Sequence, residues 1–71
     1  MEQAERERAV EAILFALGEP VPTARLAQAL DAEEDQVLAA CQALDAFYET
    51  QDRGISLVQL EESWQLISAP R

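Results

Sequence analysis

Hydrophobic positions recur with the period of a helix through most of the chain and with the texture of strands near its end. In the first run, apolar residues at i, i+3, i+4 and i+7 predict one helix with a single buried stripe. That stripe consists of Val10, Ile13, Leu14 and Leu17. Gly18 and the prolines Pro20 and Pro22 predict that the helix ends near Leu17 and that an extended connector follows.

A short second helix is predicted directly after the connector. Its buried face would consist of Leu26, Ala27 and Leu30. Thr23 is placed to cap its N-terminus. Asp31 and Glu34 have the spacing of a capping box, in which two side chains satisfy backbone N–H groups at the start of a helix. The sequence therefore predicts a tight corner at Asp31 and a new helix after it.

The third predicted helix is the longest and ends before Gly54. Its apolar stripe consists of Val37, Cys41, Leu44 and Tyr48, with Leu38 and Phe47 on the two flanks. No Lys, Arg or His lies near Cys41 in the sequence to lower the pKa of its thiol. We therefore assign this cysteine to the core rather than to a reactive site.

After Gly54 the pattern changes to two runs of β-prone residues. The runs are ISLVQL and WQLIS, joined by the polar loop EES, and this arrangement predicts a β-hairpin. Three helices followed by a two-stranded hairpin is the order of a winged helix-turn-helix. We predict one winged-helix domain over residues 1–71, in the α+β class and mostly α-helical.

Composition excludes several classes of function. The chain has 71 residues, no histidine and one cysteine, so imidazole metal sites, a zinc cluster and an intrachain disulfide framework are excluded. No apolar run approaches the ~20 residues that span a bilayer. We expect a cytoplasmic protein that is not an enzyme and that binds no metal or cofactor and no membrane.

Charge argues against the usual role of a helix-turn-helix. Fourteen acidic residues against five basic ones give a net charge of −9, which repels polyphosphate. Residues 31–52, which contain the helix that would enter the major groove, carry seven acidic side chains and no basic one. Glu61 and Glu62 place the same charge on the hairpin loop. We expect no direct contact with nucleic acid, and a DNA-binding transcriptional regulator is the alternative class.

Four segments resemble a known family. They are EAILFALGEPV, LAQAL, LDAEEDQV and GISLVQLEESWQLI, and they are similar to the N-terminal winged-helix domain of bacterial segregation and condensation protein B over Val10 to Ser68. The resemblance implies the first of two winged-helix domains in a non-enzymatic subunit of bacterial condensin. It also implies a homodimer that binds the kleisin subunit, segregation and condensation protein A, and through it the SMC ATPase at the nucleoid. One departure is the loop Glu61–Ser63, where the family often places glycine.

The resemblance also implies which hairpin residues face the helices. These are Ile55, Leu57, Leu60, Trp64 and Leu66. Because this series skips two residues between Leu57 and Leu60, it requires a bulge near Val58 and Gln59, and it leaves Val58 and Ile67 facing outward. In the competing register, Leu57 and Ile67 are the exposed pair. The inward residues are then Val58, Leu60, Trp64 and Leu66.

Three residues form the predicted interface with a partner. Phe15 lies away from the buried stripe of the first helix, so this large aromatic side chain must be covered by something else. The cover is either the chain's own hairpin or a second molecule. We predict a homodimer interface made by Phe15 together with Val58 and Ile67.

Overall fold

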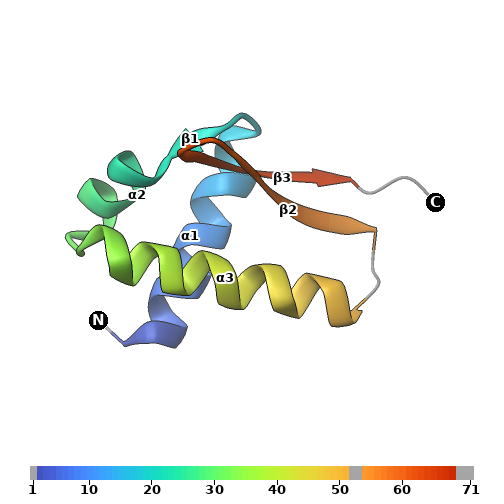
Figure 1. The fold of residues 1–71 in the computed structure, drawn as a ribbon, viewed down its shortest axis with the longest axis horizontal. Helices are drawn as coiled ribbons and strands as arrows, with labels where there is room; N and C mark the ends of the chain where they lie inside the picture. The colour runs from blue at the N-terminus through green and yellow to red at the C-terminus, as the bar shows by residue number, and fades with distance from the viewer. Residues whose placement is uncertain (1, 52–53, 69–71) are drawn as a thin grey trace.

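The computed structural model describes residues 2–51 and 54–68. Three helices precede a β-hairpin, as predicted, and the fold is a winged helix-turn-helix (Figure 1). The helices are α1 (Gln3–Leu17), α2 (Thr23–Leu30) and α3 (Glu34–Gln51). The strands are β1 (Val21–Pro22), β2 (Ile55–Leu60) and β3 (Ser63–Ser68). The two-residue strand β1, which the sequence analysis treated as a connector, is an additional element.

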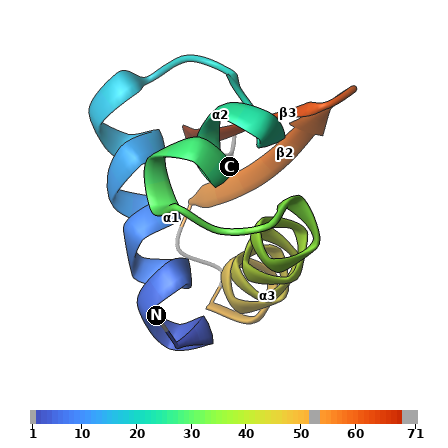
Figure 2. The same cartoon turned by 90° about the vertical axis from the view of Figure 1, so that its left-hand side faces the viewer.

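The three strands form one antiparallel sheet in the order β1-β3-β2. Among the described residues, the third strand in sequence is therefore the middle strand of the sheet. Figures 1 and 2 show α1 and α3 crossing on one side of this sheet, with α2 at the end where α3 begins. The hairpin thus covers the helices on one face and leaves its other face outward.

The core is formed where the three helices meet the inner face of the sheet. Its buried side chains are Val10, Leu14, Val21, Leu26, Ala27, Leu30, Val37, Ala40, Cys41, Leu44, Tyr48, Leu57 and Trp64. The predicted stripe of α3 is confirmed, because all four of its residues are buried. Its predicted flanks are confirmed only in part, because Leu38 is half-buried whereas Phe47 is 52% exposed. The stripe of α1 is confirmed at Val10 and Leu14, Ile13 is half-buried, and Leu17 is wrong because it is 45% exposed at the helix end.

Helix α1 ends as the sequence predicts. Gly18 adopts a left-handed conformation with φ 65°, and its backbone N–H donates to the carbonyl oxygen of Leu14 at 3.1 Å. A side chain is strained in this conformation, so glycine is the favoured residue at the position that ends the helix.

Both predicted caps at the helix-turn-helix corner are wrong. Pro22 is the N-cap of α2, and Thr23 is its first helical residue. Asp31 ends α2 in a left-handed conformation with φ 53° and does not begin α3. The backbone N–H of Glu33 instead donates to the side-chain oxygen of Gln36 at 3.0 Å. Capping at the start of α3 therefore lies two residues later than predicted.

The hairpin has an uninterrupted register, so the predicted bulge near Val58 and Gln59 is wrong. Six consecutive residue pairs join β2 and β3, and the pair Leu60 and Ser63 flanks a two-residue turn. Leu57 and Trp64 are buried, whereas Leu60 is 47% exposed although both predicted registers turned it inward. Because strand side chains alternate, Ile55, Leu57, Trp64 and Leu66 share the inner face.

Candidate interaction surface

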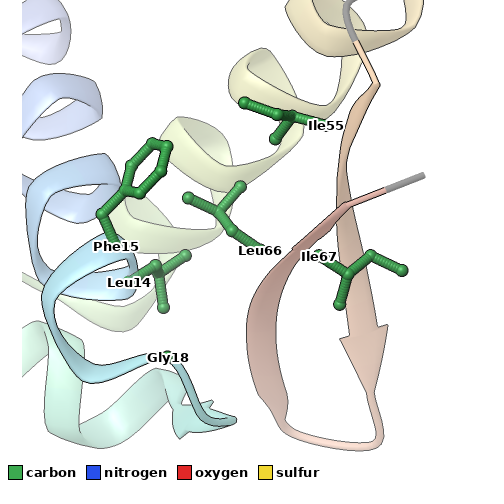
Figure 3. Close-up of a pocket in the computed structure, with 6 residues that line it drawn as sticks. All are labelled: Leu14, Phe15, Gly18, Ile55, Leu66 and Ile67. Atoms are coloured by element: carbon green, nitrogen blue, oxygen red, sulfur yellow. The ribbon is translucent and has the colours of Figure 1, made fainter.

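An apolar groove lies between the end of α1 and the hairpin. It has a volume of about 140 Å³ and is lined by Leu14, Phe15, Gly18, Ile55, Leu66 and Ile67. In Figure 3 the ring of Phe15 stands beside Leu66, whose side chain points from β3 toward α1. We call this the Phe15 groove. It contains two of the three residues predicted for a partner interface.

Phe15 is positioned by the geometry of α1. It follows the buried Leu14 by one residue, which turns its side chain about 100° away from the core. The result is a phenyl ring that is 59% exposed, the largest exposed fraction among the large hydrophobic side chains of the described residues. The chain's own hairpin therefore lies beside Phe15 but does not cover it.

Ile67 lies on the other face of β3 from Leu66. Figure 3 shows its side chain pointing away from α1, and it is 37% exposed. Val58 shares this outer face, because it pairs with Gln65 while Ile67 pairs with Ser56. Val58 is half-buried and does not line the Phe15 groove. The structure thus brings Phe15 and Ile67 to one groove and places Val58 beside Ile67 on the outer face of the sheet.

The sequence analysis did not predict two further apolar residues to be exposed. Leu17 is 45% exposed at the end of α1, and Leu60 is 47% exposed at the end of β2. The helical period assigned Leu17 to the core because the i, i+3, i+4, i+7 pattern assumes that the helix continues past this residue, whereas the helix ends there. A signal for Leu60 was present, since counting Glu61 and Glu62 as a two-residue turn turns Leu60 outward.

The junction between α1 and the sheet is held by a polar contact beside the groove. The side-chain amide of Gln65 donates to the carbonyl oxygen of Gly18 at 3.4 Å. This contact satisfies a carbonyl at the C-terminus of α1, where intrahelical partners are missing. It links the end of α1, close to Phe15, with the strand that carries Leu66 and Ile67.

The helix α3 presents acidic side chains to solvent. Exposed positions on it and just before it include Glu33, Glu34, Asp35, Gln42 and Glu49, and Asp45 is half-buried. Glu34 and Asp35 lie in the first turn of α3, where negative charge interacts favourably with the helix dipole. Their placement therefore has a structural cause, and it leaves carboxylates on the helix that would approach DNA.

The described residues contain no reactive cysteine, no three-ligand metal site and no membrane-spanning helix. Cys41 is fully buried, and burial raises the pKa of its thiol to about 12, which keeps it protonated and unreactive. Across residues 2–51 and 54–68, no group of three carboxylates, thiols or imidazoles is arranged to hold a metal ion. None of the helices in this part of the chain is long and apolar enough to cross a membrane.

Comparison with known proteins decides the family. Residues 8–71 match the family model of the segregation and condensation complex subunit ScpB. The chain belongs to the ScpB family. Among curated ScpB proteins, it is 38% identical over 66 residues to that of Lachnoclostridium phytofermentans and 37% identical over 70 residues to that of Syntrophotalea carbinolica.

The fold agrees with a solved structure of the same family. All of this chain superposes on ScpB from Mycobacterium tuberculosis with a TM-score of 0.92 at 28% identity. The two curated matches include 93% and 99% of this chain, but they include only 35% and 36% of the relatives' own length. The structural match includes 44% of the crystallised chain. The chain therefore corresponds to a little over a third of the ScpB proteins that it matches.

Proposed function

We propose that this domain is a structural, non-enzymatic module of a segregation and condensation complex, in which it forms a homodimer and contacts the kleisin subunit. The observation that carries the proposal is the apolar surface at Phe15 and Ile67 in a chain of the ScpB family. Phe15 is large, exposed and held at a groove between two elements, as interface anchors commonly are. The acidic face of α3 supports contact with protein rather than with DNA.

The dimer is supported by the position of the apolar residues. Phe15 and Ile67 lie at the same groove, and Val58 continues the apolar surface on the outer face of the sheet. A symmetric contact would use this patch on both molecules, so the same exposed side chains would be covered on each copy. Burying such a side chain contributes about 25 cal/mol per Å² of apolar area, and a chain this small has few other sources of stability.

Membership of the family supports the proposal of partners beyond the dimer. The relatives are named segregation and condensation protein B, and the family model names a complex subunit. We propose that the complete protein, with a second winged-helix domain, binds the kleisin and through it the SMC ATPase at the cytoplasmic nucleoid. Its role would be chromosome condensation and segregation by assembly rather than by catalysis.

Sedimentation velocity over a concentration series tests the dimer. We expect self-association that weakens in Phe15→Ala and Ile67→Glu, and less strongly in Val58→Thr. Phe47→Ala is the matched control, because Phe47 is also an exposed phenylalanine on a helix but lies outside the Phe15 groove. A chain that stays monomeric at every concentration, or a dimer indifferent to all three substitutions, contradicts the proposal.

A pull-down with purified kleisin tests the second contact. We expect the complete two-domain protein to retain the kleisin, and retention by residues 1–71 alone would place part of the contact in this domain. A mobility-shift assay at low salt distinguishes the alternative class. Tight duplex binding that weakens steeply with added salt would favour a DNA-binding regulator over an assembly subunit.

A further inference from the structure

A second groove lies on the helical side of the domain. It runs between the N-terminal part of α1 and the C-terminal part of α3, has a volume of about 190 Å³, and shares no lining residue with the Phe15 groove. Its lining residues are Ala4, Glu7, Arg8, Glu11, Leu44 and Phe47. We call it the Phe47 groove. It combines an apolar floor with carboxylates, whereas the Phe15 groove is lined by apolar residues and one glycine.

The aromatic ring of this groove is exposed but supported. Phe47 is 52% exposed, and its ring stands edge-on to that of Tyr48, with 5.7 Å between centroids and 69° between planes. Tyr48 is buried, and its hydroxyl donates a hydrogen bond to the Glu11 carboxylate. One buried tyrosine thus adjoins both the exposed ring and a carboxylate of the groove. Such support lowers the cost of ordering these side chains when a ligand binds.

The charges of the groove favour a cationic occupant. Two carboxylates, Glu7 and Glu11, line it against one guanidinium, that of Arg8. The hydrogen bond from Tyr48 uses one oxygen of Glu11, and a carboxylate has further lone pairs with which to accept. The chain as a whole carries 14 acidic and 5 basic residues, which repels anionic lipid and nucleic acid and attracts basic protein segments.

We propose that the Phe47 groove binds an amphipathic protein segment that inserts an arginine side chain beside an apolar one. The arginine's aliphatic stem would lie against Leu44, and its guanidinium would stack on the exposed face of Phe47. The planar guanidinium then donates to the carboxylates of Glu7 and Glu11. The proposal concerns a surface separate from the proposed dimer, so either can hold without the other.

A peptide titration tests this site on the chain of residues 1–71. The probe is a short fluorescein-labelled helical peptide with leucine and arginine on one face, and its counterpart carries citrulline, which keeps the size of arginine without its charge. We expect fluorescence anisotropy to report binding of the arginine peptide that weakens with added salt, and weaker binding of the citrulline peptide. Backbone amide shifts in NMR should change around Phe47 and Glu7.

Substitutions in the Phe47 groove are expected to change its affinity for the peptide in opposite directions. Phe47→Ala should weaken peptide binding about tenfold, as loss of an aromatic anchor does. Glu7→Gln should weaken peptide binding about threefold. Arg8→Gln should strengthen it by a similar factor, because this substitution removes a positive charge that repels the arginine of the peptide. Phe15→Ala is the control and should leave peptide binding unchanged. All four positions are exposed or half-buried, and far-UV circular dichroism checks that each variant is folded.

The outcomes separate this inference from the proposed function. Equal binding of the arginine and citrulline peptides, no change in Phe47→Ala, or amide shifts confined to the Phe15 groove would each overturn it. Loss of self-association in Phe15→Ala with unchanged peptide binding supports the dimer and this site together. Binding of the peptide by a chain that never dimerises supports the site alone.

Discussion

The indole N–H of Trp64 donates a hydrogen bond to the hydroxyl oxygen of Thr23 across 3.0 Å. The same hydroxyl donates to the carbonyl oxygen of Glu62 at 3.0 Å, and the backbone N–H of Thr23 donates to that carbonyl at 2.8 Å. The first residue of α2 is thereby joined to the hairpin turn. A hydroxyl in this buried place satisfies the one polar atom of a core tryptophan.

Thr23→Val keeps the shape of the side chain and removes the hydroxyl. We expect the free energy of unfolding to fall by about 1–3 kcal/mol, because the indole N–H of Trp64 is left buried without its partner. Chemical unfolding followed by tryptophan fluorescence measures the change. Thr23→Ser retains the hydroxyl and is the control, and it should cost less than the valine variant. Equal stability of Thr23→Val and the natural chain would contradict the role assigned to this bond.

Glu61 occupies a backbone conformation that favours glycine. Its φ is 59°, in the first position of the two-residue hairpin turn, whereas Glu62 is not among the described residues with positive φ. We expect Glu61→Gly to raise the melting temperature, with a gain of about 0.5–1 kcal/mol, since side chains are strained in this region. Glu62→Gly is the matched control and should bring no gain. A loss of stability in Glu61→Gly would contradict the expectation.

The hydrogen bond from Tyr48 to Glu11 joins α3 to α1. Tyr48→Phe removes the bond while keeping the buried ring, and we expect it to lower the free energy of unfolding by about 1 kcal/mol. Glu11→Gln keeps an acceptor oxygen and should cost less. Urea unfolding of the two variants measures the difference. The helix pair would be held by apolar packing alone if both variants matched the natural chain.

Stability should fall in alkaline solution. Burial raises the pKa of the Cys41 thiol from 9.0 to about 12, and burial together with the nearby Glu11 carboxylate raises the pKa of the Tyr48 hydroxyl. The unfolded chain therefore releases these protons at lower pH than the folded one, so stability is fully present below pH 9 and declines as pH rises toward 12. Urea midpoints from about pH 8 to about pH 11 measure the slope, which should be shallower in Tyr48→Phe.

Cys41 should resist alkylation in the folded chain. Its side chain is fully buried and its raised pKa leaves little thiolate at neutral pH. Iodoacetamide labelling followed by mass spectrometry should be slow in buffer and fast in denaturing urea. Labelling at equal rates in both solutions would show that α3 opens readily around this residue.

Local patterns predicted the helices and the hairpin well. The stripe from Val37 to Tyr48 and the stop at Gly18 depend on neighbours within a few residues, which the sequence displays directly. The position of Phe15 on the surface followed from the same period. The family resemblance, carried by contiguous segments, predicted the fold and is confirmed by the match over residues 8–71.

Features that depend on distant partners were predicted poorly. Thr23 was interpreted as a cap because capping is local, but its hydroxyl is used by Glu62 and Trp64, about forty positions away. The register of the hairpin was misassigned because Leu60 was taken as a core residue and the turn as three residues long. The short strand β1 has no sequence signal of its own, since it exists only by pairing with β3. Nothing in the sequence singled out the Phe47 groove, because α1 and α3 together form it.

The position of β3 at the centre of the sheet has a consequence for synthesis of the protein. β3 follows β1 and β2 in the sequence, yet both of those strands pair with it and not with each other. A ribosome that has released only the helices and β2 has therefore released no partner for either strand, and Trp64 has not yet reached the core. The helices can associate as they emerge, but neither β1 nor β2 can pair within the sheet until β3, which ends at Ser68, has left the exit tunnel.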